Sequence, residues 1–300
     1  MPHTMPMLHV LATCLAVVLA ACGPDAAADT ATADTATAVS APPSLADSVA
    51  DVGTGRPYRF DEPVARFELP GALVEISALT VLDADHLGAV EDEDGDLYVL
   101  SVETGEVVRV VPFGPPGDYE GIERVGERLF VLRADGAVLE LSGWSGDAAR
   151  SAVYETGLGA KACDAEGLGA DARRLLIACK KPNDSGLDPV YAFDLATMAL
   201  VPEPVLSLDR GAVPGEGKLR VSAIAVHPVT GQTVALSSAR GALVVLDADG
   251  GVADVWDLSP AALVQPEGLA FLPNGDLFVS SEGRDGRAVL VRFAYDGAGR

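Results

Sequence analysis

The chain of 300 residues has few aromatic side chains, at 5%, and only four histidines. So few aromatic rings argue against a stacking platform for carbohydrate. Because no cluster of histidine and cysteine accompanies the acidic residues, a zinc site is disfavoured. Basic residues are also scarce: 21 Lys and Arg stand against 44 Asp and Glu, which gives a formal net charge of −23. Such a surface repels nucleic acid and anionic lipid headgroups, and it suits cations or high solubility.

The common phosphate-binding motifs are also missing. The sequence contains no Gly-Lys phosphate loop and no Rossmann fingerprint after a strand. Patterning of helical period is nearly absent as well, apart from a short "SPAALV" stretch near Ser259. Hydrophobic residues nevertheless make up 49% of the chain, which is enough for a substantial core. The composition therefore indicates a folded protein built almost entirely from strands.

The N-terminal segment has the pattern of an export signal. An apolar run extends from Met7 to Ala21 and is too short for a comfortable transmembrane helix. It ends in Leu-Ala-Ala-Cys, which resembles a bacterial lipobox. The resemblance implies that residues 1–21 are a signal peptide, that Cys22 carries diacylglycerol on its sulfur, and that an acyl chain such as palmitate is added to its amino group. The alternative is an ordinary secretory signal followed by a chance cysteine.

Residues 22–56 are predicted to be a tether. The stretch after Cys22 is rich in Ala, Thr and Asp and has almost no large apolar side chain, so it cannot form a core. The folded domain is expected over residues 57–300. Together these features predict a monomeric lipoprotein of the bacterial cell envelope. Gly23 at the second mature position favours the outer membrane over the inner membrane.

Internal repeats indicate the architecture of this domain. Five segments each contain three or four short apolar strands separated by polar or glycine-containing turns. Their first strands begin around five anchor positions, which are Ser77, Glu120, Glu166, Ser222 and Glu267. The spacings between anchors are 43, 46, 56 and 45 residues. Repeats of about 40–50 residues with four strands each are typical of a β-propeller.

The repeats predict an all-β fold, a five-bladed β-propeller, with six blades as the alternative. The last repeat ends after about three strands, and a lone strand, "PVARFELP" at Pro63–Pro70, precedes the first repeat. This strand is expected to complete the last blade and close the ring, which also removes exposed sheet edges. A β-sandwich would not explain the regular anchors, and a solenoid would lack the closing strand. The longer third interval is interpreted as a loop insertion, "KKPNDSGLDP".

The repeat motifs resemble a known family. The segments "YEG", "AEGL" with "LLIACK", and "PEGLAFLPNGDLFVSSE" on an exported chain are similar to the SdiA-regulated family of bacterial propeller proteins, distant relatives of NHL-repeat proteins. The resemblance covers about Phe67 to Phe293 and implies five blades and a bound calcium ion, but no settled activity. Ala78 and Ala223 depart from the glycine that is more usual after the anchor.

Three of the anchors are glutamates: Glu120, Glu166 and Glu267. The first strand of each blade lines the central channel of a propeller, so these carboxyl groups are expected at one mouth of the channel. Carboxylates crowded there repel each other unless some are protonated or a cation lies among them. Calcium binds six to eight oxygen ligands in irregular geometry and fits this set better than magnesium, which prefers a strict octahedron.

The ends of the second strands lie at the same mouth. Glu91, Glu282 and the adjacent Asp92 extend the predicted acidic site, whereas Arg133 and Lys180 either neutralise the glutamates or hold an anionic ligand. The alternative is that these charged side chains bind no ligand and only form a solvated rim around the channel mouth. "EDEDGD", from Glu91, lacks the spacing and flanking helices of an EF-hand and is interpreted as a hairpin turn.

Two cysteines lie in the folded domain. Cys163 precedes the Glu166 anchor, and Cys179 closes the paired strand, so both are expected near the same end of one blade. Export permits a disulfide between them; two buried thiols are the alternative. The histidines of this domain, His86 and His227, are predicted in turns at the opposite end from the glutamates, which disfavours a Ser–His–Asp triad.

These observations leave three functions open. The first is a calcium-binding, membrane-anchored binding or scaffold module. The second is a metal-dependent hydrolase of phosphoesterase, phytase or lactonase type that uses the mouth carboxylates, although no clear base or nucleophile is present. The third is a protein-interaction surface of the kind found in NHL relatives. Neither the ligand nor a partner can be read from the chain.

Overall fold

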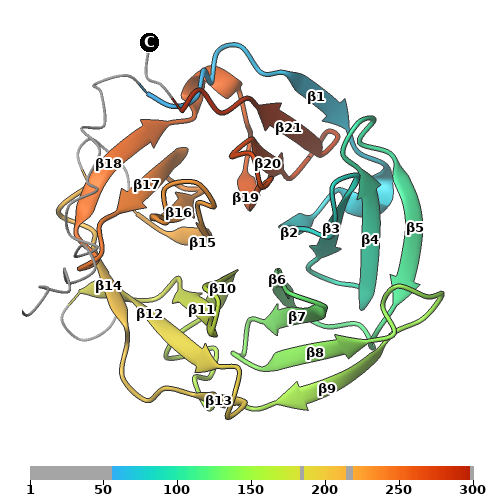
Figure 1. Ribbon diagram of the computed structural model, residues 1–300, viewed down its shortest axis with the longest axis vertical. Helices are drawn as coiled ribbons and strands as arrows, with labels where there is room; N and C mark the ends of the chain where they lie inside the picture. Colours follow the sequence, from blue (N-terminus) through green and yellow to red (C-terminus); the bar gives the residue numbers. More distant parts are fainter. Residues whose placement is uncertain (1–55, 183–185, 214–218, 298–300) are drawn as a thin grey trace, which may run out of the picture. The chain divides into compact units, whose positions relative to one another are not determined.

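The computed structural model describes residues 56–182, 186–213 and 219–297. Within this part the chain forms five antiparallel sheets arranged around a central axis, each with its first strand innermost (Figure 1). The prediction of a five-bladed β-propeller is thus confirmed. The predictions for residues 1–55, including lipid on Cys22 and the tether, lie outside the described residues. No helix within the described residues has the length and apolar character needed to cross a bilayer.

The first two blades have four strands each. Blade 1 contains β2 (Ile76–Val81), β3 (His86–Glu91), β4 (Asp96–Ser101) and β5 (Val107–Pro112). Blade 2 contains β6 (Tyr119–Val125), β7 (Arg128–Arg133), β8 (Val138–Ser142) and β9 (Arg150–Tyr154). β3 ends at Glu91 and β4 begins at Asp96, so the acidic stretch "EDEDGD" is a hairpin turn, as predicted.

Blade 3 differs from the others because two short strands share one partner. It contains β10 (Ala165–Ala170), β11 (Arg174–Cys179), β12 (Leu187–Asp194), β13 (Ala199–Leu200) and β14 (Leu206–Asp209). β13 pairs with the end of β12 and β14 with its beginning. The insertion predicted as a loop is therefore partly strand, since β12 begins at Leu187.

The ring is closed by the N-terminal strand, as predicted. Blade 4 contains β15 (Val221–Val226), β16 (Thr233–Ser237), β17 (Ala242–Leu246) and β18 (Val252–Asp257). Blade 5 contains β19 (Pro266–Phe271), β20 (Leu277–Ser281), β21 (Val289–Phe293) and, as its outer strand, β1 (Ala65–Glu68). Short 3-10 turns occur at Gly71–Leu73 (η2) and Ser259–Ala261 (η3).

A second contact reinforces this closure. The buried Tyr58 hydroxyl donates a hydrogen bond to the Gly275 carbonyl at 2.7 Å and lies 2.8 Å from His227 Nε2. Its ring packs edge-on against Trp256. The segment before β1 is therefore fixed against blades 4 and 5, and His227 serves this aromatic cluster rather than the channel mouth.

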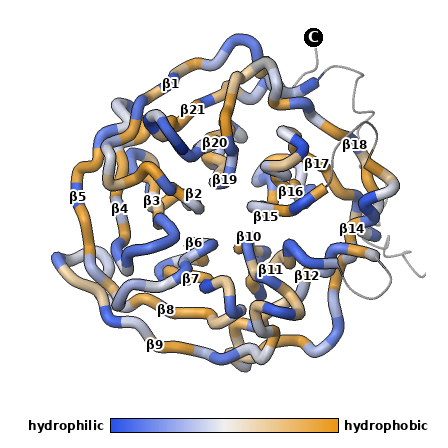
Figure 2. The backbone as a smooth tube through the Cα atoms, turned by 180° about the vertical axis from the view of Figure 1, so that it is seen from behind, coloured by the Kyte–Doolittle hydropathy of each residue, from blue (hydrophilic) through white to orange (hydrophobic). Residues whose placement is uncertain are grey.

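The hydrophobic core lies between blades. One cluster joins Val90 and Val99 of blade 1 to Ile122 and Val131 of blade 2, and similar clusters fill the other interfaces. Figure 2 shows hydrophobic residues concentrated along the strands and hydrophilic residues in many of the connecting turns. The alternation of side chains along each strand places one set against each neighbouring blade. The packing thus fixes the inner strands around the axis.

Candidate functional site

All five anchors occupy the same irregular position in their blades. In each blade the pairing of the first and second strands shifts register where the anchor stands, for example between Tyr119 and Gly121 around Glu120. This is a β-bulge, which removes one residue from the ladder and redirects its side chain. The bulge explains why a glutamate is tolerated at the beginning of an inner strand. The sequence repeat located the anchors but did not predict the bulge.

The two serine anchors connect neighbouring blades. Ser77 Oγ donates a hydrogen bond to the Tyr119 carbonyl at 2.7 Å, and Ser222 Oγ donates one to the Pro266 carbonyl at 3.2 Å. A small residue also follows each anchor, and after Glu120 it is Gly121 that lets the neighbouring blade approach closely. A Cβ added to Gly121 would lie 2.6 Å from Leu168 Cβ of the next blade. The serines therefore hold the ring together, while the three glutamates are available for other contacts.

The three axial glutamates, Glu120, Glu166 and Glu267, share their surroundings with a lysine. Glu166 is buried, and its Oε1 accepts a hydrogen bond from Lys180 Nζ at 2.7 Å. Burial lowers the pKa of Lys180, but this hydrogen bond and the charges of all three glutamates outweigh it and raise the pKa. Of the two cations considered from the sequence, Lys180 is the one that contacts this group. Arg133 instead pairs with Asp135 at 2.6 Å.

The axial carboxyl groups hold their protons unusually tightly. Burial, followed by the charge of Glu166 and a hydrogen bond with Asp118, raises the pKa of Glu120 to about 9. Burial, followed by the charges of Glu282 and Glu166, raises the pKa of Glu267 to about 7. Burial also raises the pKa of Glu166, although Lys180 opposes the shift. Burial thus favours the protonated form of these groups, neighbouring carboxylates add to the effect, and the lysine opposes it at Glu166.

A second acidic group lies at the same end of blade 1. Glu75, Glu91 and Asp92, which we call the rim cluster, have carboxylate oxygens within 4.8 Å of one another. Within the described residues, this is the trio of acidic side chains close enough to share one metal ion. Glu91 and Asp92 were predicted from the sequence; Glu75, which directly precedes β2, was missed. Glu75 could have been predicted from its position, because it directly precedes a strand that starts at the channel mouth.

The turn beside the rim cluster is held firmly. The backbone N–H of Asp94 donates to Glu91 Oε1. Gly95 accepts hydrogen bonds through its carbonyl from Phe113 and Gly114, at 2.7 and 3.1 Å, in the segment before β6. A Cβ on Gly95 would overlap the Gly114 backbone, so glycine is required there. The carboxylate of Glu91 is therefore oriented by the hairpin itself.

One atom of the rim cluster lacks a protein partner. Asp92 Oδ1 is buried and has no hydrogen bond within the described residues. Burial, then the charges of Glu75 and Glu93, raises the pKa of Asp92 to about 6. Glu282 is influenced by the same residue: burial, followed by the charge of Asp92, raises the pKa of Glu282. A buried, unpaired carboxylate oxygen is costly unless a cation or a proton satisfies it.

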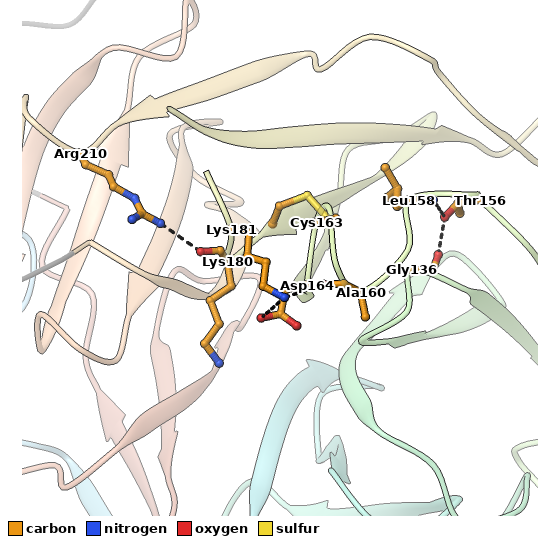
Figure 3. The surroundings of a disulfide bond; sticks show 10 residues. Gly136, Thr156, Leu158, Ala160, Cys163, Asp164, Lys180, Lys181 and Arg210 are labelled. Atoms are coloured by element: carbon orange, nitrogen blue, oxygen red, sulfur yellow. Dashed lines mark hydrogen bonds and ion pairs between the residues drawn. A yellow bond between two sulfur atoms is a disulfide. The ribbon is translucent and has the colours of Figure 1, made fainter. Parts of the chain in front are cut away.

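The cysteines predicted to pair lie beside the axial group. Cys163 and Cys179 are both buried, and their sulfur atoms are 2.01 Å apart (Figure 3). Cys179 pairs with Ala165 across β10 and β11, so the disulfide links the two chain segments that carry Glu166 and Lys180. The bridge therefore joins the segments from which Glu166 and Lys180 project.

The comparisons with known proteins agree with this architecture. No protein-family model matches the chain, and no curated protein matches it. Among solved structures, the glutaminyl cyclase of Myxococcus xanthus aligns with a TM-score of 0.59 and 18% identity, over 78% of this chain and 96% of that one. The WD40 β-propeller domain of Doa1 aligns with a TM-score of 0.49 and 12% identity, over 78% and 96%. The likeness to the cyclase shows a shared fold, and the chain is a five-bladed β-propeller protein.

Proposed function

We propose that this protein is a calcium-binding β-propeller of the SdiA-regulated type, anchored in the bacterial cell envelope through lipid on Cys22 and acting there as a binding or scaffold module. The observation that carries the calcium proposal is the rim cluster with its unpaired, buried Asp92 Oδ1. The anchor rests on the lipobox-like N-terminal sequence.

The donor atoms of the rim cluster fit calcium. All are carboxylate oxygens, which hard cations prefer, and no sulfur or imidazole accompanies them. Two oxygens bound to one calcium ion at 2.3–2.6 Å can be no more than about 5 Å apart. The observed limit of 4.8 Å satisfies this condition. Glu75, Glu91 and Asp92 would hold the ion, with Glu282 from blade 5 as a further candidate. With Glu282 as a ligand, the ion would join the first and last blades.

Calcium is expected to stabilise the fold. A ligand at 100 times its Kd adds about 2.7 kcal/mol to the free energy of unfolding. For a domain of this size, that raises the melting temperature by roughly 5–10 °C. Thermal melts in calcium and in EDTA measure the difference. Asp92→Asn should abolish it, whereas Asp85→Asn, which removes the same charge from an exposed turn at the other end of blade 1, should leave it unchanged. Equal melts of the unsubstituted protein in both solutions would refute the calcium proposal.

Acidification is expected to act oppositely on calcium binding and on the calcium-free protein. Asp92 titrates near pH 6 when folded, above its usual range, so lowering the pH through 6 should protonate a ligand and weaken calcium affinity. In EDTA, the folded state binds that proton more tightly than the unfolded chain. The contribution of Asp92 to the free energy of unfolding therefore rises as the pH falls from about 6 to 4. Melts at several pH values, with and without calcium, measure both slopes. A calcium effect that is the same at pH 5 and pH 7.5 would contradict this assignment.

The metal-dependent hydrolase considered from the sequence is the less favoured function. It requires Glu120, Glu166 and Glu267 to share a catalytic metal, yet Glu166 already accepts a hydrogen bond from Lys180. Turnover of a phosphomonoester, phytate or lactone that depends on Glu166 would reverse this preference.

A further inference from the structure

His227 is a buried histidine whose two ring nitrogens both take part in hydrogen bonds. It is 1% exposed and begins the turn between β15 and β16. The backbone N–H groups of Val229 and Thr230 each donate to its Nδ1 at 3.2 Å. Because Nδ1 accepts these two bonds, the neutral ring carries its hydrogen on Nε2. Nε2 then donates to the Tyr58 hydroxyl at 2.8 Å, and this hydroxyl donates to the Gly275 carbonyl.

These hydrogen bonds join segments that are far apart in the sequence. The segment that contains Tyr58 is held a second time at Pro57, whose carbonyl accepts a hydrogen bond from the Asp296 N–H at 2.8 Å. The ring of Tyr295 packs against His227 with 4.8 Å between ring centroids, and against Tyr58 with 5.6 Å. The neutral imidazole is therefore the polar centre of a contact between the N-terminal segment, the blade 4 turn and the C-terminal segment.

The elements around His227 bring no counter-charge into contact with its ring. Their titratable and charged groups are Tyr58, Tyr295, Asp296, Asp276 and Arg292, with Asp254 beside Trp256 on β18. Asp276 is paired with Arg292 at 2.6 Å, and Asp254 accepts the indole N–H of Trp256 at 2.7 Å. Among the residues that the structure describes, only the Tyr58 hydroxyl bonds to the imidazole through a side chain. Burial therefore lowers the pKa of His227 to about 4.

We propose that His227 and Tyr58 form an acid-sensitive latch, which holds the N-terminal segment against blades 4 and 5 and opens when His227 is protonated. A hydrogen added to Nδ1 would point at the N–H groups of Val229 and Thr230, so both of these bonds would be lost together. The charged ring would also be buried without a counter-charge, which is costly. The protonated ring therefore leaves its site, and Tyr58 loses its partner. This inference does not depend on calcium.

The latch is expected to open between about pH 6.5 and pH 4. Above this range, His227 is neutral in both the closed and the open state, so the latch keeps its full strength. As the pH falls, the open state binds a proton that the closed state does not. With a pKa of about 4 when closed and an ordinary value when open, the ratio of open to closed latch should rise roughly 30-fold from pH 7.5 to pH 5.

The test is hydrogen exchange at single backbone amides of the purified protein, measured by NMR in EDTA and expressed as protection relative to an unstructured peptide at the same pH. A local measurement is needed because Asp92 contributes the opposite pH dependence to global stability. Protection of the Val229 and Thr230 amides should fall about 30-fold from pH 7.5 to pH 5. Protection of the Asp296 amide, which bonds to the N-terminal segment, should fall in parallel.

Two variants separate the latch from other effects of acid. His227→Asn keeps an oxygen that can accept from the turn but cannot titrate, so protection should change less than about twofold between the two pH values. His86→Asn removes a histidine whose side chain is 38% exposed at the same end of blade 1, and it should behave like the unsubstituted protein. An equal loss of protection in His227→Asn and the unsubstituted protein would overturn the inference.

Two further results would also overturn it. One is unchanged protection of Val229 and Thr230 at pH 5. The other is a loss confined to these two amides while Asp296 stays protected, because the N-terminal segment would then remain bound. If His227→Asn does not fold, NMR titration of the ring nitrogens in the unsubstituted protein decides the question. Nδ1 should stay unprotonated down to pH 5, and a titration midpoint at pH 6 or above would contradict the latch.

Discussion

Substitution of Arg210 by methionine is expected to lower the free energy of unfolding by about 3–5 kcal/mol, because it leaves a buried carboxylate without its counter-charge. Asp188 is fully buried on β12, and Arg210 contacts both of its oxygens. For a domain of this size, the melting temperature should fall by roughly 6–20 °C. Denaturant unfolding measures the change.

The control for this prediction is Arg220→Met, which removes an exposed arginine from the beginning of the next blade and should cost less than about 0.5 kcal/mol. Replacing both partners, as Arg210→Met with Asp188→Leu, should recover much of the loss, since no buried charge then remains. Equal stability of the Arg210 and Arg220 variants would contradict the importance of this pair. Because Arg210 also holds the Lys180 carbonyl, its loss should disturb the axial ion pair as well.

Removal of the disulfide should cost about 3 kcal/mol. The bridge closes a loop with a sequence separation of 16, and a loop of about 15 residues gives this value through the entropy of the unfolded chain. The double variant Cys163→Ala/Cys179→Ala leaves small apolar side chains in the buried site. Guanidinium unfolding under oxidising and reducing conditions provides the measurement. The double variant is the control, because its unfolding midpoint should be the same under both conditions. An unsubstituted protein whose unfolding midpoint is unaffected by full reduction would contradict the prediction.

The fold was predictable because each sequence repeat corresponds to one blade. The recurring anchors and the alternating apolar strands predicted five blades, and the incomplete last repeat predicted that Pro63–Pro70 supplies the closing strand, which the structure has as Ala65–Glu68. The Tyr58 contact was not predictable, because its partners Gly275 and His227 belong to turns more than 160 residues away. Blade 3 also differs, because β14 pairs with residues that resembled a loop.

The site was predicted in its composition but not in its arrangement. The repeat gave Glu120, Glu166 and Glu267 correctly as equivalent anchors, yet equivalence says nothing about which cation meets them. Arg133 and Lys180 differ in register: Arg133 pairs with Tyr119 as Cys179 pairs with Ala165, so Lys180 stands one position further along, where blade 2 has Ala134. Arg133 forms an ion pair with Asp135, whereas Lys180 forms one with Glu166. Glu75 was missed because it lies just before its strand, two residues ahead of the Ser77 anchor, at the position that Asp118 and Asp164 occupy in the next two blades.

The most direct test of the account is a crystal structure of the folded domain grown with calcium, examined by anomalous diffraction. The account predicts one peak among the carboxylates of Glu75, Glu91 and Asp92, with Lys180 still paired to Glu166. A peak among Glu120, Glu166 and Glu267, or no peak at calcium concentrations that saturate binding in solution, would contradict it.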